Sequence, residues 1–285
     1  MLRRVFIGSS LAAAAGAMAG AARAQQRFRF GVTPWQRGQT FDDIRPLYRP
    51  LLDHLGRALP ASFTLIGARS YEEMRDYLIE GQVDVAAISP APYVMAKARN
   101  PGIELIATEL SWNEDRSAHV DSYTGMIVAL RDRADITGVA DLKGKVFGFV
   151  SESSTSGYQV PSAMLRRMGI DHRSHFARSL FLGSHPRVTD ALVAGSIDAG
   201  ATWDFNLRQA TAKHGDVFKI VQTFPPIPNL CIAAHPGMPQ PMRARLRAAL
   251  LAVEPSLLQG LSAVGYVERP DSFYDPVRAI VGLEP

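Results

Sequence analysis

The chain contains a single cysteine, and after its first 24 residues it has no run of 18 apolar residues. One cysteine excludes an intramolecular disulfide, and the apolar run Leu230–Ala234 around Cys231 predicts a buried strand with an inert thiol. The sequence also lacks the Gly-Lys-Ser/Thr of a P-loop and the Gly-x-Ser-x-Gly of a nucleophile elbow. These absences argue against a disulfide-rich scaffold, a later membrane span, a P-loop nucleotidase and an α/β-hydrolase.

Candidate metal ligands are also scarce. His172 and His175 have i, i+3 spacing, but two ligands in a polar loop are too few for a zinc site. We therefore predict neither a metal nor a cofactor.

The first 24 residues are typical of an export signal. Arg3-Arg4 precede a weakly hydrophobic, Ala/Gly-rich run, and Ala22-Arg23-Ala24 fits a small-x-small cleavage site before Gln25. The paired arginines fit a twin-arginine signal, with a Sec signal as the alternative. An uncleaved membrane helix is disfavoured by the Ala and Gly content. We expect a mature protein in the periplasm that is not inserted in the membrane.

Loss of the leader changes what the net charge means. The leader contains three arginines and no acidic residue, so its removal lowers the formal net charge from +4 to +1. A nearly neutral chain has no electrostatic signature of a nucleic-acid-binding protein.

One pattern occurs twice in the chain. Tyr71 begins a helical stretch that ends at Gly81, and His185 begins one that ends at Gly195, so each aromatic ring precedes its glycine by ten positions. A serine precedes both rings, and Gly-x-Val/Ile-Asp closes both copies. Such a repeat predicts two units of the same supersecondary structure.

Strands and helices alternate around each copy. We expect structural roles for the closing Asp84 and Asp198, such as holding a neighbouring turn. The strand candidates are Phe28 to Val32, Phe63 to Ile66, Val146 to Val150 and Ser179 to Leu182. Two βαβαβ units predict an α/β protein with two lobes, each a mostly parallel sheet flanked by helices. Because ligands bind beyond the carboxyl ends of such strands, Tyr71 and His185 are expected to face one interlobe cleft.

Two extended segments, near Tyr123 and near Ile227, are the best candidates for chain crossings between the lobes. The second is rich in proline and therefore stiff. We predict that lobe 1 comprises residues 25–122 and 226–285 and that lobe 2 comprises residues 123–225.

Three local features are also expected. Pro46 and Pro50 interrupt the apolar pattern from Asp42 to Leu59, which predicts a helix in two pieces. Residues 109–121 are polar and uneven, which predicts a loop. The basic residues on the helix predicted within 241–261 are expected to be solvated.

The run Ser153-Ser154-Thr155-Ser156-Gly157 follows a predicted strand and opens a helix. Free N–H groups and the helix dipole bind anions at such a position, hydroxyls add donors, and glycine allows close approach. Serine and threonine also cap helices, but four hydroxyls exceed the needs of one cap. The run therefore indicates an anion site. A lone histidine is usually structural, but the repeat makes His185 a candidate donor to the anion, together with Tyr71 and Tyr123.

Several motifs together are similar to those of one family. They are Phe30–Pro34, Ser70-Tyr71, Ser89-Pro90, Ser122–Gly125, Asp141–Lys145, Ser154–Gly157 and Gly183-Ser184-His185. Over nearly the whole mature chain the sequence resembles the periplasmic phosphate/phosphite/phosphonate-binding proteins of ABC importers. This PhnD-like family has a two-lobed type II solute-binding fold with its ligand in the interlobe cleft.

The resemblance implies ligand-binding roles for individual residues. In that family the hydroxyls matching Ser154, Thr155 and Ser156 bind the phosphonyl oxygens at the helix N-terminus. Two tyrosines and a histidine, which match Tyr71, Tyr123 and His185, complete the shell, and Ser89 is a further candidate.

The resemblance also bears on the ligand's size and charge. Family members that bind aminoethylphosphonate supply carboxylates for the amine, and the matching positions here hold Phe205 and Leu230. Asp204 is adjacent, although it would have to point the other way. Trp35 and Trp203 are expected to narrow the pocket. We therefore predict a small ligand such as phosphate, phosphite or methylphosphonate.

The resulting hypothesis is an exported, monomeric solute-binding protein without catalytic activity. It would capture a small phosphorus oxyanion by lobe closure and deliver it to an ABC permease and ATPase. Two alternatives remain open. One is a periplasmic receptor that presents its ligand state to a sensor kinase. The other is a secreted hydrolase using a serine of residues 153–156 with His185, although no third residue is placed to orient the histidine.

Overall fold

The computed structural model describes residues 26–33, 40–113 and 115–284. The predicted leader and Trp35 lie outside these residues. Within the described ranges, no helix is long and apolar enough to cross a membrane.

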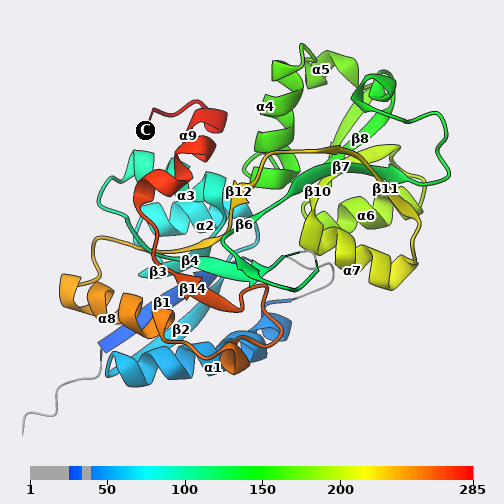
Figure 1. Ribbon diagram of the computed structural model, residues 1–285. Helices are drawn as coiled ribbons and strands as arrows, with labels where there is room; N and C mark the ends of the chain where they lie inside the picture. The colour runs from blue at the N-terminus through cyan, green and yellow to red at the C-terminus, as the bar shows by residue number, and fades with distance from the viewer. Residues whose placement is uncertain (1–25, 34–39, 114, 285) are drawn as a thin grey trace, which may run out of the picture.

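Two β-sheets form the centres of two lobes (Figure 1). The strands of the lobe 1 sheet are β1 (Gln26–Val32), β2 (Ala61–Gly67), β3 (Val85–Ile88), β4 (Glu104–Trp112), β5 (His119–Val120), β13 (Cys231–Ala234) and β14 (Gly265–Val267). The strands of the lobe 2 sheet are β7 (Gly125–Leu130), β8 (Val146–Phe149), β9 (Arg178–Phe181), β10 (Ala199–Trp203) and β11 (Phe218–Thr223). The first sheet has the order β14-β4-β13-β3-β1-β2, with β5 beside β4, and the second has the order β11-β7-β10-β8-β9.

Helices flank both sheets. Those of lobe 1 are α1 (Phe41–Ala58), α2 (Tyr71–Ile79), α3 (Pro90–Arg99), α8 (Gln240–Leu251) and α9 (Asp275–Val281). Those of lobe 2 are α4 (Val160–Arg167), α5 (His172–His175), α6 (His185–Val193) and α7 (Asp204–His214). Short 3₁₀ turns cover Val139–Leu142, Pro255–Leu258 and Asp271–Tyr274, and a π-helical turn, η2, covers Thr155–Gln159.

The duplicated sequence folds into the same three-stranded unit in each lobe. Strands β2-β1-β3 and β9-β8-β10 are parallel and have the same spatial order. The next strand in each sheet, β13 or β7, is antiparallel to it. The prediction of mostly parallel sheets is therefore wrong, because strands outside the repeat add antiparallel pairs and make both sheets mixed.

The closing residues of the repeat have matching structural roles. The Asp84 carboxylate accepts the backbone N–H of Arg29 in β1 at 2.7 Å, and Asp198 accepts that of Val146 in β8 at 2.7 Å. Gly81 and Gly195 follow their helices with φ of 69° and 66°, a left-handed conformation that favours glycine. The structural role expected for the two aspartates is confirmed, with a strand rather than a turn as the partner.

The chain passes between the sheets twice, at neighbouring places. Strand β6 (Ser122–Tyr123) lies between β4 of lobe 1 and β7 of lobe 2, and β12 (Ile227–Pro228) lies between β11 and β13. These two segments pair with each other in antiparallel fashion. The lobe boundaries predicted at 122/123 and 225/226 fall in or beside this pair.

Two local predictions are wrong. The first helix is continuous, because its prolines are exposed while Ile44, Leu51 and Leu55 stay buried along one face. The predicted loop at 109–121 is partly strand, since β4 continues to Trp112 and pairs with both β14 and β5.

The basic helix face is also less solvated than expected. Arg243 and Arg247 of α8 both form ion pairs with Glu104 at the start of β4, at 2.6 and 2.8 Å. These pairs fix α8 on the sheet.

Candidate functional site

A cavity of about 60 Å³ lies between the lobes, and residues of both lobes line it. Seven of the eight predicted ligand residues are among its lining: Ser154, Thr155, Ser156, Tyr71, Tyr123, His185 and Ser89. A single water needs only roughly 10–15 Å³, so the cavity has room for more than one water-sized group. This inner cavity therefore suits a small ligand.

The hydroxyl run forms one wall of the cavity. Ser154 is the N-cap of η2, and its Oγ accepts the Gly157 N–H at 3.2 Å. The first N–H groups of a helix have no intrahelical acceptor, and those of Thr155 and Ser156 have none elsewhere in the described chain. The wall thus offers free backbone donors, side-chain hydroxyls and the positive end of a helix dipole.

The glycine of the run has a packing role. A Cβ added to Gly157 would collide with the side chain of Val150, the last residue before the loop. Glycine is therefore required for packing of η2 against this segment, and its expected role in close approach to a ligand stays a prediction.

A second helix N-terminus points at the same wall. Ser89 is the N-cap of α3 and makes no side-chain capping bond. The Ala91 N–H in the first turn of α3 donates to Thr155 Oγ1 at 2.9 Å, across the two lobes. The N-termini of α3 and η2 therefore converge on one place, from opposite lobes.

Tyr71 extends from lobe 1 into lobe 2. Its ring lines the inner cavity and packs against a lobe 2 core cluster that includes Val150 and Val188. The neighbouring Glu72 accepts the Ser153 N–H at 3.0 Å, a further bond between the lobes. Burial raises the pKa of the Tyr71 hydroxyl to about 12, so the group remains a hydrogen-bond donor at neutral pH.

Tyr123 lies at the crossing between the lobes. It is buried, its hydroxyl interacts with those of Ser156 and Thr155, and its ring packs edge-on against Trp203 with a centroid distance of 5.2 Å. Burial raises the pKa of Tyr123 above its ordinary value. This tyrosine therefore adds a neutral hydroxyl beside the serine run, and Trp203 narrows the cavity as predicted.

A chain of hydrogen bonds fixes the His185 ring. Asn206 Nδ2 donates to Thr202 Oγ1 at 2.9 Å, and that hydroxyl is 3.3 Å from His185 Nδ1. Thr202 Oγ1 accepts from Asn206 and still has its own proton to donate to Nδ1; in that arrangement the ring hydrogen is on Nε2. Burial lowers the pKa of His185 to about 3, so the imidazole is a neutral donor.

The predicted hydrolase pairing has no support in this geometry. A serine nucleophile needs a hydrogen bond to its base. Here Thr202 occupies His185 Nδ1, Ser154 Oγ caps η2, and none of the hydroxyls at 153–156 is bonded to the ring among the described residues.

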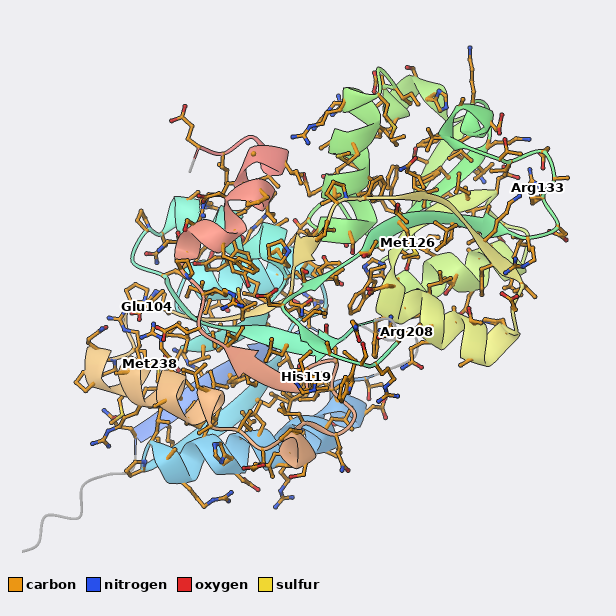
Figure 2. All side chains as sticks on the ribbon, viewed as in Figure 1. Glu104, His119, Met126, Arg133, Arg208 and Met238 are labelled. Carbon is orange, nitrogen blue, oxygen red and sulfur yellow. The ribbon has the colours of Figure 1, made fainter. Side chains whose placement is uncertain are left out.

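Asp204 is the exception among the predicted ligand residues. Its carboxylate accepts the backbone N–H groups of Thr124 and Phe205 at 3.3 and 2.6 Å. It lines an outer groove with Phe205, Arg208 and His119, next to the inner cavity. Figure 2 labels two of the groove residues, Arg208 on α7 and His119 near β14. One carboxylate oxygen thus accepts from the first turn of α7 and the other from the crossing segment, and the expected ligand role of Asp204 stays a prediction.

Sequence reasoning missed several lining residues. They are Thr33, Tyr48, Met74, Glu109, Asn206 and Ser262. Asn206 lies one turn after Thr202 and had no motif to mark it. Glu109 is the most consequential, because it is a buried carboxylate in a cavity whose described lining contains no lysine or arginine.

Most of the chain, from within β1 to the end of the last 3₁₀ turn, matches a known family. The model of the family described as "ABC transporter, phosphonate, periplasmic substrate-binding protein" matches residues 30–274. The phosphate-import protein PhnD of Mycolicibacterium smegmatis is 26% identical over 181 residues, which are 61% of this chain and 55% of the relative. A probable phosphite-binding protein of Prochlorococcus marinus is 31% identical over 121 residues, which are 40% of this chain and 39% of the relative. The chain thus matches about half the length of these curated relatives or less.

Solved structures share the fold. The binding component of a phosphonate ABC transporter from Pseudomonas aeruginosa has a TM-score of 0.77 at 18% identity, covering 90% of this chain and 86% of its own. PhnD1 of Prochlorococcus marinus, solved with methylphosphonate, has a TM-score of 0.74 at 18% identity, covering 90% and 97%. The two-lobed periplasmic binding protein fold predicted from the sequence is confirmed.

Proposed function

Because the chain belongs to the family of periplasmic substrate-binding proteins of phosphonate ABC transporters, we propose that it captures a small phosphorus oxyanion for import. Phosphate, phosphite and methylphosphonate are the candidate ligands. This choice of ligands is supported by the relatives named above, which are a phosphate-import protein, a probable phosphite-binding protein and a protein solved with methylphosphonate. A membrane permease and an ATPase would be the partners, and the family match favours this role over that of a receptor for a sensor kinase.

The observation that carries the proposal is the concentration of neutral donors in the inner cavity. Two helix N-termini, the hydroxyls of Ser154 to Ser156, Tyr71 and Tyr123, and the neutral imidazole of His185 converge there. Hydrogen bonds from neutral donors to an ionised acceptor are about twice as strong as neutral ones. Such a shell binds an oxyanion without a fixed counter-charge and releases it when the lobes open.

Calorimetric titration of the purified protein tests this proposal. Methylphosphonate, phosphate and phosphite are expected to bind, and aminoethylphosphonate is expected to bind more weakly than methylphosphonate. The reason for the difference is that Phe205 and Leu230 offer its ammonium no charge. Absence of binding by all three small oxyanions overturns the proposal.

Export is tested separately. We propose that residues 1–24 are removed and that the mature chain begins at Gln25. Cell fractionation followed by N-terminal sequencing is expected to find this residue first in the periplasmic fraction. An intact leader in a membrane fraction is the contrary result.

A further inference from the structure

The inner cavity has an acidic end in addition to its donor-rich wall. Glu109 of β4 lines it together with Tyr48 and Ser262. Its side chain is buried, with 6% of its surface exposed, and among the described residues its only side-chain partner is Ser262 Oγ at 3.4 Å. An ionised carboxylate accepts about four hydrogen bonds, so most of its capacity is unused.

Among the described residues, the groups around Glu109 supply no positive charge. Tyr48 of α1, Cys231 of β13 and Tyr266 of β14 are its titratable neighbours there, and all are neutral at pH 7. Arg243 and Arg247 of α8 are paired with Glu104 at the start of the same strand. Burial accordingly raises the pKa of Glu109 to about 7.

A bound oxyanion brings a second negative charge into the same cavity. Two like charges in a poorly solvated site strongly disfavour each other, unless a proton or a cation lies between them. A ligand ammonium could supply the cation, but space is limited. The inner cavity is small, about 60 Å³, which suits methylphosphonate better than the longer aminoethylphosphonate.

We propose that Glu109 and the bound oxyanion hold one proton between them, which makes Glu109 a specificity-determining residue for ligands that can carry that proton. This inference rests on the proposed function. A monoanionic ligand donates its P–OH hydrogen to the ionised carboxylate, and no proton is exchanged with water. A dianionic ligand that meets ionised Glu109 takes up one proton from water, and the proton is released when the ligand leaves.

Proton counting by calorimetry tests the proposal, with methylphosphonate as the probe. Titrations in two buffers of different ionisation heat give the number of protons taken up on binding. At about pH 8.5, where Glu109 is ionised, the parent is expected to take up nearly one proton more than Glu109→Gln, whose amide donates its own hydrogen. Near pH 6 the difference is expected to vanish. Affinity of the parent is expected to fall up to about tenfold more per pH unit above pH 7 than that of the variant.

Glu104→Gln is the matched control, because Glu104 is on the same strand but outside the cavity and at the outer side of lobe 1 (Figure 2). It is expected to keep the parent's proton count. The parent alone is already decisive, so the test does not depend on the folding of Glu109→Gln. Tight methylphosphonate binding by the parent without proton uptake at about pH 8.5 overturns the role of Glu109 and leaves the proposed function intact.

Aminomethylphosphonate provides the second arm. If it binds the parent at least about tenfold more tightly than methylphosphonate, and Glu109→Gln abolishes that preference, the partner of Glu109 is a cation and the shared proton is overturned. Similar or weaker binding supports the shared proton. Failure of every phosphorus oxyanion to bind overturns the proposed function itself.

Discussion

The two copies of the repeat have kept the same scaffold but differ where each helix meets the cleft. In both copies an aspartate holds the first strand, and a left-handed glycine ends the helix. At the helix starts the copies diverge. Ser70 Oγ accepts the Glu73 N–H at 3.1 Å and caps α2, whereas Ser184 makes no cap and its buried Oγ has no partner among the described residues. The residues that fix the backbone therefore have the same roles in both copies, whereas the serines at the helix starts, next to the cleft, have different roles.

A larger difference lies outside the repeat. Both lobes contribute neutral donors to the cavity, but among the described lining residues only lobe 1 adds an acidic side chain, that of Glu109. The stability of the ligand-free protein should reflect this charge. Because burial raises the pKa of Glu109 in the folded state to about 7, from an ordinary value of 4.5, its contribution is favourable below about pH 4.5 and is lost as the pH rises through 7.

We therefore expect Glu109→Gln to gain stability relative to the parent between pH 5 and 8.5, by up to about 3 kcal/mol. Urea denaturation across this range measures the difference. Glu104→Gln retains the buried Glu109 and should keep the parent's pH trend. A gap between parent and Glu109→Gln that does not change with pH contradicts the assignment of Glu109 as a buried, unpaired acid.

The structural role that the two aspartates share can be tested by the same substitution in each copy of the repeat. Asp84→Ala and Asp198→Ala each remove a charged acceptor from a backbone N–H and from an arginine, Arg29 or Arg133. We expect each to cost about 1.5–3 kcal/mol in the free energy of unfolding. A clear cost for only one of them would show that the two copies are not structurally equivalent.

The hydroxyl-lined wall of the cavity, Ser154 to Ser156, should affect ligand affinity while the protein stays folded. Ser156→Ala and Thr155→Ala each remove one hydrogen bond to the ionised ligand, and we expect methylphosphonate affinity to fall roughly 10- to 150-fold. Ser162→Ala is the control, because Ser162 is buried in α4 outside the cavity and its hydroxyl has no partner in the described chain. Unchanged affinity in both wall variants would remove the anion-site interpretation of this segment.

Substitutions of the serines that precede α2 and α6 are expected to have the smallest effects on stability. Ser70→Ala should cost about 1 kcal/mol, since it leaves a helix N–H without its acceptor. Ser184→Ala should be close to neutral, because its hydroxyl makes no bond to lose. Equal losses, measured by thermal or urea unfolding, would mean that the two helix starts are energetically alike.

The features that depend on residues close together in the sequence could be predicted. The repeat spacing, the hydroxyl run and the two proline-rich or extended crossings placed Tyr71, Tyr123, His185 and Ser154–Ser156 correctly around one cavity. Each of these depends on the order of residues within a short segment.

What the sequence did not reveal depends on distant pairings. Glu109 lies in a segment that looks like a polar loop, and it becomes part of a strand because β13 and β14, far later in the chain, both pair with β4. The mixed sheets have the same cause, because β13 joins lobe 1 after the whole of lobe 2. Asp204 lines the outer groove and not the inner cavity, because adjacency in the sequence does not fix side-chain direction.

The central claim is that one bound oxyanion is shared between the lobes, with Tyr71 as the bridge from lobe 1. Small-angle scattering with and without saturating methylphosphonate tests it most directly. The parent should show a smaller radius of gyration with ligand, and Tyr71→Phe should bind more weakly and close less, because it keeps the ring but loses the bridging hydroxyl. Lobe 2 retains its donors, so the variant's affinity should fall without vanishing. Equal closure of Tyr71→Phe and the parent at saturation would contradict the claim.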